Sequence, residues 1–137
     1  MLDVEVLGAE YIRDAPPFEE MQRLCIVAAA SAGISDGHVA VEFVDSERIA
    51  LLNGEHRGKP TATDVLSFPI DGTGTSAGGV YDAGLRELGD VVICPQHTAD
   101  LREAIVHGVL HLVGMDHETD DGEMLSLQRE LLAAERR

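Results

Sequence analysis

The chain has 137 residues, of which 45% are hydrophobic and 26% charged, a balance that is typical of a globular protein and excludes a largely disordered one. No apolar run approaches the roughly 18 residues of a membrane span, and the opening segment does not read as a secretory signal, so we expect a cytoplasmic protein. The formal net charge of -15 excludes indiscriminate binding to nucleic acid, because a negative surface repels phosphate; any such function requires a local site.

The domain organisation is expected to be simple. The sequence contains no repeat, low-complexity tract or long linker, which predicts one domain spanning residues 1–137. Cys25 and Cys94 are its only cysteines, and neither belongs to a C-x-x-C pair. We therefore expect two buried thiols rather than a disulfide framework or a thiolate zinc site.

The first third of the chain predicts two strands separated by a helix. Residues 2–8 alternate between apolar and polar side chains, as a half-buried strand does. A helix is expected to begin near Pro16 and Pro17, with acidic residues in its first turn, and to end near Gly33. Residues 38–44 alternate again and predict the second strand.

A short helix and a third strand are expected next. Ser46 is a plausible N-cap for the helix, and Gly54 is expected to end it. Residues 63–70 predict a strand, in which Pro69 favours an edge position or a strand end.

The remaining elements complete the predicted fold. Five glycines within residues 72–84 predict a flexible surface loop and match no phosphate-binding motif. Residues 88–94 predict a fourth strand, followed by a helix through residue 113 and a final helix over residues 121–135. On one face, the final helix carries Met124, Leu127, Leu131 and Leu132. Four strands interleaved with helices indicate an α/β or α+β sandwich; we expect α+β, with a mixed four-stranded sheet and a central, buried, metal-binding helix.

Three histidines near the end of that helix suggest a metal site. His107 and His111 are the only polar residues in an apolar run, and their spacing of four places both rings on one helical face. Gly114 can end the helix in a left-handed conformation, so that His117 approaches the same point. Three histidines would bind Zn²⁺ and leave a fourth position for water, as catalytic zinc sites do. The alternative is three ordinary histidines with hydrogen-bond partners.

The motif differs from that of zinc proteases, and this difference bears on the substrate. In H-E-x-x-H a glutamate follows the first histidine and acts as a base, whereas this chain has Gly108 there. A zinc-bound water can reach a pKa near neutrality without that base. The missing carboxylate also suits a phosphodiester substrate, because a negative side chain would repel phosphate.

A phosphodiester substrate calls for a cation, and Arg57 is the candidate. It lies between Gly54 and Gly58 in a locally basic segment of an acidic chain, where its guanidinium could bind a phosphate in bidentate fashion. A solvated loop charge is the alternative reading. The sequence spacing does not connect this segment to the histidines.

The segment "HGVLHLVGMDHE" closely resembles the H-G-x-L-H-L-x-G-x-D-H signature of the YbeY family of bacterial endoribonucleases. The segments "LNGEHRGKPTATDVLSFP" and "ELGDVVIC" resemble two further blocks of that family, in the same order. The resemblance implies a zinc-dependent, single-strand-specific endoribonuclease that acts in small-subunit ribosomal RNA processing and ribosome quality control. It assigns one zinc ion to His107, His111 and His117, and places Arg57 in the active-site cleft.

The same resemblance implies partners: single-stranded ribosomal RNA, the small ribosomal subunit and ribosome-assembly factors, without a membrane. Two other functions remain open, namely a zinc metalloprotease-like hydrolase and a non-catalytic zinc-containing module that binds in ribosome assembly. One departure from the family is a shorter segment before the zinc helix. Within it, we interpret His97 as an exposed loop or helix-start residue rather than a fourth ligand. Asp116 either fixes an imidazole tautomer or binds turn backbone groups.

Overall fold

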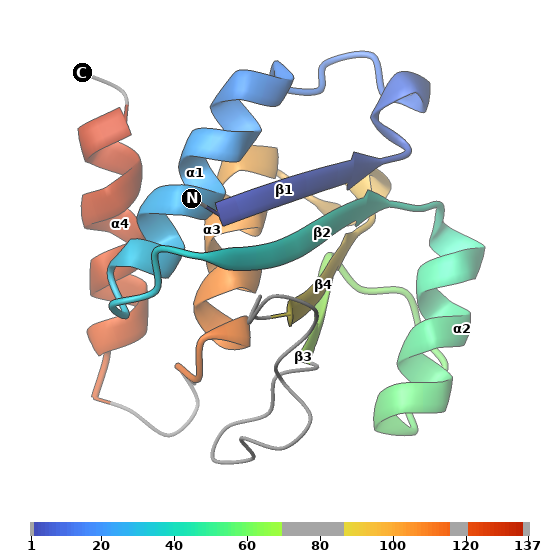
Figure 1. Ribbon diagram of the computed structural model, residues 1–137. Coiled ribbons are helices and arrows are strands. Elements are labelled where there is room, and N and C mark those ends of the chain that lie inside the picture. The colour runs from blue at the N-terminus through green and yellow to red at the C-terminus, as the bar shows by residue number, and fades with distance from the viewer. Residues whose placement is uncertain (1, 70–86, 116–120, 136–137) are drawn as a thin grey trace.

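The computed structural model describes residues 2–69, 87–115 and 121–135 (Figure 1). The predicted glycine-rich loop over residues 72–84 lies outside the described residues. The strands are β1 (Leu2–Leu7), β2 (Gly37–Phe43), β3 (Val65–Pro69) and β4 (Glu87–Ile93), and the helices are α1 (Phe18–Ala30), α2 (Ser46–Arg57), α3 (Leu101–Leu112) and α4 (Glu123–Glu135). Two short 3-10 turns, η1 (Ala9–Tyr11) and η3 (Pro95–His97), follow β1 and β4.

The strands form one mixed four-stranded sheet in the order β1-β2-β4-β3. β1 and β4 both pair with β2 in parallel, whereas β3 pairs with β4 in the antiparallel direction. Pro69 is the last residue of β3, at the edge of the sheet, where its missing N–H breaks no ladder. The predicted α+β class, the four strands and the position of Pro69 are confirmed.

Helices cover both faces of the sheet (Figure 1). α1, α3 and α4 pack together on one face, and α3 contacts both β3 and β4. α2 covers the other face near β3 and β4, where Ile49 packs with Leu66 and Val92. Four α3 side chains, Ile105, Val106, Val109 and Leu110, are completely buried, so the prediction of a central, buried helix is confirmed for its apolar side.

Two expectations for α2 are wrong in detail. Asp45 rather than Ser46 is the N-cap, and its carboxylate accepts a hydrogen bond of 2.8 Å from the Arg48 backbone N–H. The helix also continues through Gly54 and ends at Arg57. Gly58 (φ 72°) takes the left-handed conformation that ends the helix. Its N–H donates to the carbonyl oxygens of Asn53 and Gly54 in the last turn. Gly54 serves packing, since a Cβ there would lie 3.2 Å from that of Pro60.

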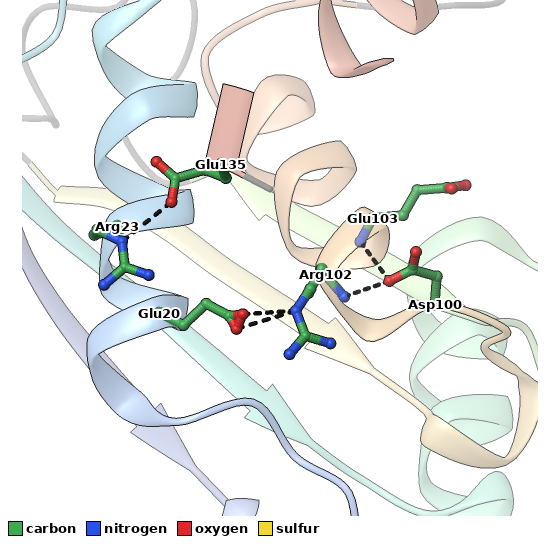
Figure 2. Close-up of polar contacts among 6 residues, drawn as sticks. All are labelled: Glu20, Arg23, Asp100, Arg102, Glu103 and Glu135. Atoms are coloured by element: carbon green, nitrogen blue, oxygen red, sulfur yellow. Dashed lines mark hydrogen bonds and ion pairs between the residues drawn. The ribbon is translucent and has the colours of Figure 1, made fainter. Parts of the chain in front are cut away.

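Ion pairs connect the three helices that share a face of the sheet (Figure 2). The Arg102 Nε lies 2.7 Å from Glu20 and joins α3 to α1, while the Arg23 Nε lies 3.1 Å from Glu135 and joins α1 to α4. Both pairs are partly exposed, so each contributes at most about 1 kcal/mol to stability. Asp100 caps α3 by accepting hydrogen bonds from two backbone N–H groups of its first turn.

Both cysteines are buried and free, as predicted. Burial raises the pKa of the Cys25 thiol to about 12, which leaves it protonated and unreactive near neutral pH. Among the described residues, no helix has the length and apolar character needed to cross a membrane.

His38 joins the three parallel strands on the sheet face away from α1. Its Nδ1 lies 2.7 Å from Glu87 on β4, and its Nε2 lies 3.3 Å from Glu5 on β1. Partial burial disfavours the charged ring, but the hydrogen bond with Glu87 and the charges of Glu87, Asp3 and Glu5 outweigh it, so the pKa of His38 is raised. Asp90 also faces this cluster, and burial raises its own pKa.

The raised His38 pKa predicts a pH-dependent contribution to stability. That contribution is complete below the unfolded histidine pKa of about 6.5 and is lost as the pH rises through the higher folded value. The His38→Gln variant should lack this loss. Urea unfolding of both proteins over a pH series through neutrality measures it; a wild-type stability that rises relative to His38→Gln over this range would contradict the prediction.

Candidate active site

α3 presents His107 and His111 on one face, one turn apart. Both rings are half-buried rather than buried like the apolar side of this helix, because their face borders a cavity instead of the core. The ring centroids are 4.7 Å apart at an interplanar angle of 77°, and the two Nε2 atoms are separated by 3.2 Å. The predicted convergence of these two nitrogens is therefore present.

The other nitrogen of each ring faces a carbonyl oxygen. The Nδ1 of His107 lies 2.8 Å from the side-chain Oε1 of Gln128 on α4, and the Nδ1 of His111 lies 3.0 Å from the backbone oxygen of Met115. Gly114 has φ 103° and turns the chain after α3, which brings the Met115 oxygen into reach. Because a carbonyl oxygen only accepts, a ring that hydrogen-bonds it carries a proton on its Nδ1.

This arrangement fits a tetrahedral zinc ion. Two nitrogens bound at 2.0 to 2.1 Å in tetrahedral geometry lie about 3.3 Å apart, close to the observed separation of 3.2 Å. His117, the third predicted ligand, lies outside the described residues, as does Asp116. Within residues 2–69, 87–115 and 121–135, no group of three or more His, Cys, Asp or Glu residues is placed to bind a metal.

Gly108 has a packing role that the motif comparison did not reveal. A Cβ at this position would lie 2.3 Å from the Cγ1 of Val91, because α3 lies directly against β4 here. Its carbonyl oxygen accepts a hydrogen bond of 2.9 Å from the Ser67 hydroxyl on β3. The position faces the sheet, so the absence of a glutamate follows from close packing and is not by itself evidence for a phosphodiester substrate.

A cavity of about 630 Å³ joins the histidine pair to Arg57. Arg57 is exposed at the end of α2, and β3 lies between α2 and α3 in the cavity lining. The other lining residues are His56, Thr63, Asp64, Val65, Leu66, Ser67, Pro69, Gly114 and Met115. The structure thus connects the basic segment with the histidine motif, which sequence spacing could not do.

Two residues in or behind this cavity were missed by the sequence reasoning. His56 lines the cavity, and its ring centroid lies 4.5 Å from that of Phe68. Gln128 is 5% exposed and sits between buried Met124 and Leu132 on the inner face of α4. The sequence did contain a signal for Gln128. It is a polar residue with an apolar residue four positions away on either side, so it lies on the apolar face of its helix.

His97 is exposed in η3, as predicted, and its Nε2 lies 2.6 Å from the Ser46 hydroxyl, outside the histidine cavity.

A larger cavity, of about 1160 Å³, lies at the carboxyl ends of β1, β2 and β4. It is lined by charges of both signs, from Arg13 and Arg102 to Asp14, and contains none of the predicted site residues.

Fold and cavity define an α+β protein in which an imidazole pair and a guanidinium share one cavity. The family profile described as Endoribonuclease YbeY matches residues 18–135. A Macrococcus caseolyticus protein described as Endoribonuclease YbeY is 35% identical over 149 residues, covering 98% of this chain and 96% of the relative. A Geobacillus kaustophilus protein of the same description is 37% identical over 135 residues, covering 87% and 86%.

The chain therefore belongs to the endoribonuclease YbeY family, which confirms the resemblance found in its motifs. A solution structure of a Thermotoga maritima protein aligns with a TM-score of 0.53 at 24% identity, covering 96% of this chain and 88% of that one. This likeness supports the fold alone.

Proposed function

We propose that this protein is a zinc-dependent, single-strand-specific endoribonuclease, with residues 1–137 acting as one YbeY-like metallohydrolase domain. Membership of the family supports hydrolysis of RNA phosphodiester bonds. The observation that carries the metal part is the pair of Nε2 atoms of His107 and His111, 3.2 Å apart, with both Nδ1 atoms directed to carbonyl oxygens.

Each site residue has a distinct role in this proposal. His107, His111 and His117 would bind one zinc ion, which supplies a Lewis acid and makes hydroxide available near neutral pH. The guanidinium of Arg57 binds a non-bridging phosphate oxygen and stabilises the negative charge that grows there in the transition state.

The net charge bears on how RNA reaches this site. With a formal charge of -15, the isolated chain should bind RNA weakly and with a modest dependence on salt, since few phosphates can meet a cation. We propose ribosomal RNA in the cytoplasm as the substrate, with the small ribosomal subunit and assembly factors presenting it during maturation and quality control.

The two alternative functions differ from this one at the cavity. A metalloprotease needs a carboxylate base, and among the described lining residues the only carboxylate is that of Asp64, whose Oδ1 already accepts hydrogen bonds from Val65 N–H and the Thr63 hydroxyl. A structural zinc site in a binding module would have its fourth position filled by protein. Both alternatives predict no RNA cleavage.

Metal content and RNA cleavage, measured on the same preparation, test the proposal. Protein purified without chelator should contain about one zinc per chain and cut single-stranded ribosomal RNA, while leaving the duplex form of the same sequence intact. Removing the metal with a chelator should stop cleavage, and zinc should restore it. Zinc-loaded protein that cleaves no RNA would favour a binding module, and peptide hydrolysis would favour the protease.

The Arg57→Ala variant should cleave RNA about 10²–10³-fold more slowly while retaining its zinc, because a preorganised donor to the developing charge is lost. Arg48→Ala is the matched control, since Arg48 is an exposed arginine in the first turn of the same helix and does not line the histidine cavity. Single-turnover cleavage rates and zinc content of both variants decide the matter. Equal cleavage rates for the two variants would show that Arg57 is a solvated surface charge with no role in cleavage.

A further inference from the structure

Gln128 reaches the histidine pair from a different helix. It belongs to α4, is 5% exposed, and places Oε1 2.8 Å from the Nδ1 of His107 on α3. α4 contacts both α3 and α1, and the pair between Arg23 and Glu135 connects its far end to α1. The position of the Gln128 amide therefore depends on how α4 packs against α3 and α1.

The two histidines differ in what orients them. The partner of His111 is the Met115 backbone oxygen, four residues along the chain, which any side chain at position 115 would preserve. The partner of His107 is a side-chain amide oxygen 21 residues away, which a single substitution removes. The orientation of His107 therefore depends on the residue at position 128.

The chemistry of the amide determines the tautomer of His107. Oε1 can only accept, so it retains the proton on Nδ1 and leaves the Nε2 lone pair directed toward the Nε2 of His111. With no acceptor at position 128, the Nδ1–H would lose its hydrogen bond with the Gln128 amide. The ring would then gain by moving its proton to Nε2, where that proton blocks a ligand position.

We propose that Gln128 is a positioning residue that holds His107 as the Nδ1–H tautomer, so that its Nε2 is available to a metal ion. The metal part of this inference rests on the proposed function. The tautomer is a property of the metal-free chain and can be measured separately.

The first measurement is the tautomer of His107 in the metal-free protein, from ¹⁵N–¹H correlation NMR of the neutral imidazole rings. Wild type should show a protonated Nδ1 and an unprotonated Nε2. Protonation on Nε2 in wild type would overturn the inference without any variant.

Two substitutions at position 128 extend the test to metal binding. Gln128→Met keeps the size of the side chain but replaces the amide oxygen with a thioether sulfur, a much weaker acceptor, and should weaken zinc binding about 10–100-fold in competition with a chromophoric chelator. Gln128→Glu keeps an acceptor oxygen and should restore the Nδ1–H tautomer and most of the affinity. Wild-type affinity and tautomer in Gln128→Met would overturn the inference.

The Leu132→Ala variant separates positioning from packing. Leu132 is buried on the same helix, so its loss should lower the Tm but leave the His107 tautomer and the zinc affinity unchanged. If Leu132→Ala and Gln128→Met weakened zinc binding equally, Gln128 would serve packing only, and the inference would fail. If wild type bound no zinc, the proposed function would fail, whereas the tautomer measurement would still decide the role of Gln128.

Discussion

The His111→Ala variant is expected to lose both zinc and RNA cleavage. The substitution removes one of the two Nε2 atoms that lie 3.2 Å apart, so the loss of affinity should exceed the roughly 10–100-fold that follows when only a ligand's hydrogen-bond partner is removed. His117→Ala should behave in the same way, because we propose His117 as the third ligand. Metal content by mass spectrometry and cleavage of single-stranded ribosomal RNA measure the two losses.

His97→Ala is the matched control for these histidine variants. His97 is exposed, contacts Ser46 and lies outside the cavity, so its removal should leave zinc content and cleavage rate unchanged. Full cleavage by metal-free His111→Ala protein would defeat the zinc mechanism and point to a contaminating nuclease.

The Gly108→Ala variant is expected to be less stable, because overpacking a core usually costs about 1–3 kcal/mol. Alanine favours a helix over glycine by about 1 kcal/mol, which offsets part of this cost. The clash should dominate, because the new Cβ would lie 2.3 Å from the Val91 Cγ1 and a β-branched side chain on a sheet has little freedom to move away. Urea unfolding measures the change in free energy.

A double-mutant cycle with Val91→Ala identifies the cause. Removing the Val91 methyl groups makes room for the new Cβ, so Gly108→Ala should cost less in the Val91→Ala background, with a coupling of about 0.5–3 kcal/mol. Additive effects would show that the contact with Val91 is not what excludes a side chain at position 108.

This packing explains one limit of reading the site from its motif. The sequence comparison treated Gly108 as a missing base, because in H-E-x-x-H that position carries the carboxylate. The structure directs the position toward β4, so its occupant is determined by how closely α3 approaches the sheet. Helix-to-sheet distance is a tertiary property, and no local pattern of residues contains it.

The end of α2 illustrates a similar limit on a smaller scale. Gly54 was predicted to end this helix, and Gly58 lies four residues further along the chain. In the structure the helix ends just before Gly58, because Gly54 packs against Pro60 and Gly58 takes the left-handed conformation. Arg57 is therefore the last residue of a helix rather than part of a turn.

The sequence by itself determined the four strands, the helix carrying His107 and His111, and the family. These depend on local periodicity and motif spacing, and a separation of four residues on a helix already places two rings on one face. Only the tertiary structure decided that Arg57 shares their cavity and that Gln128 contacts His107. Residues 21 to 54 positions apart along the chain meet through strand order and helix packing, and those contacts arise only when the whole core assembles.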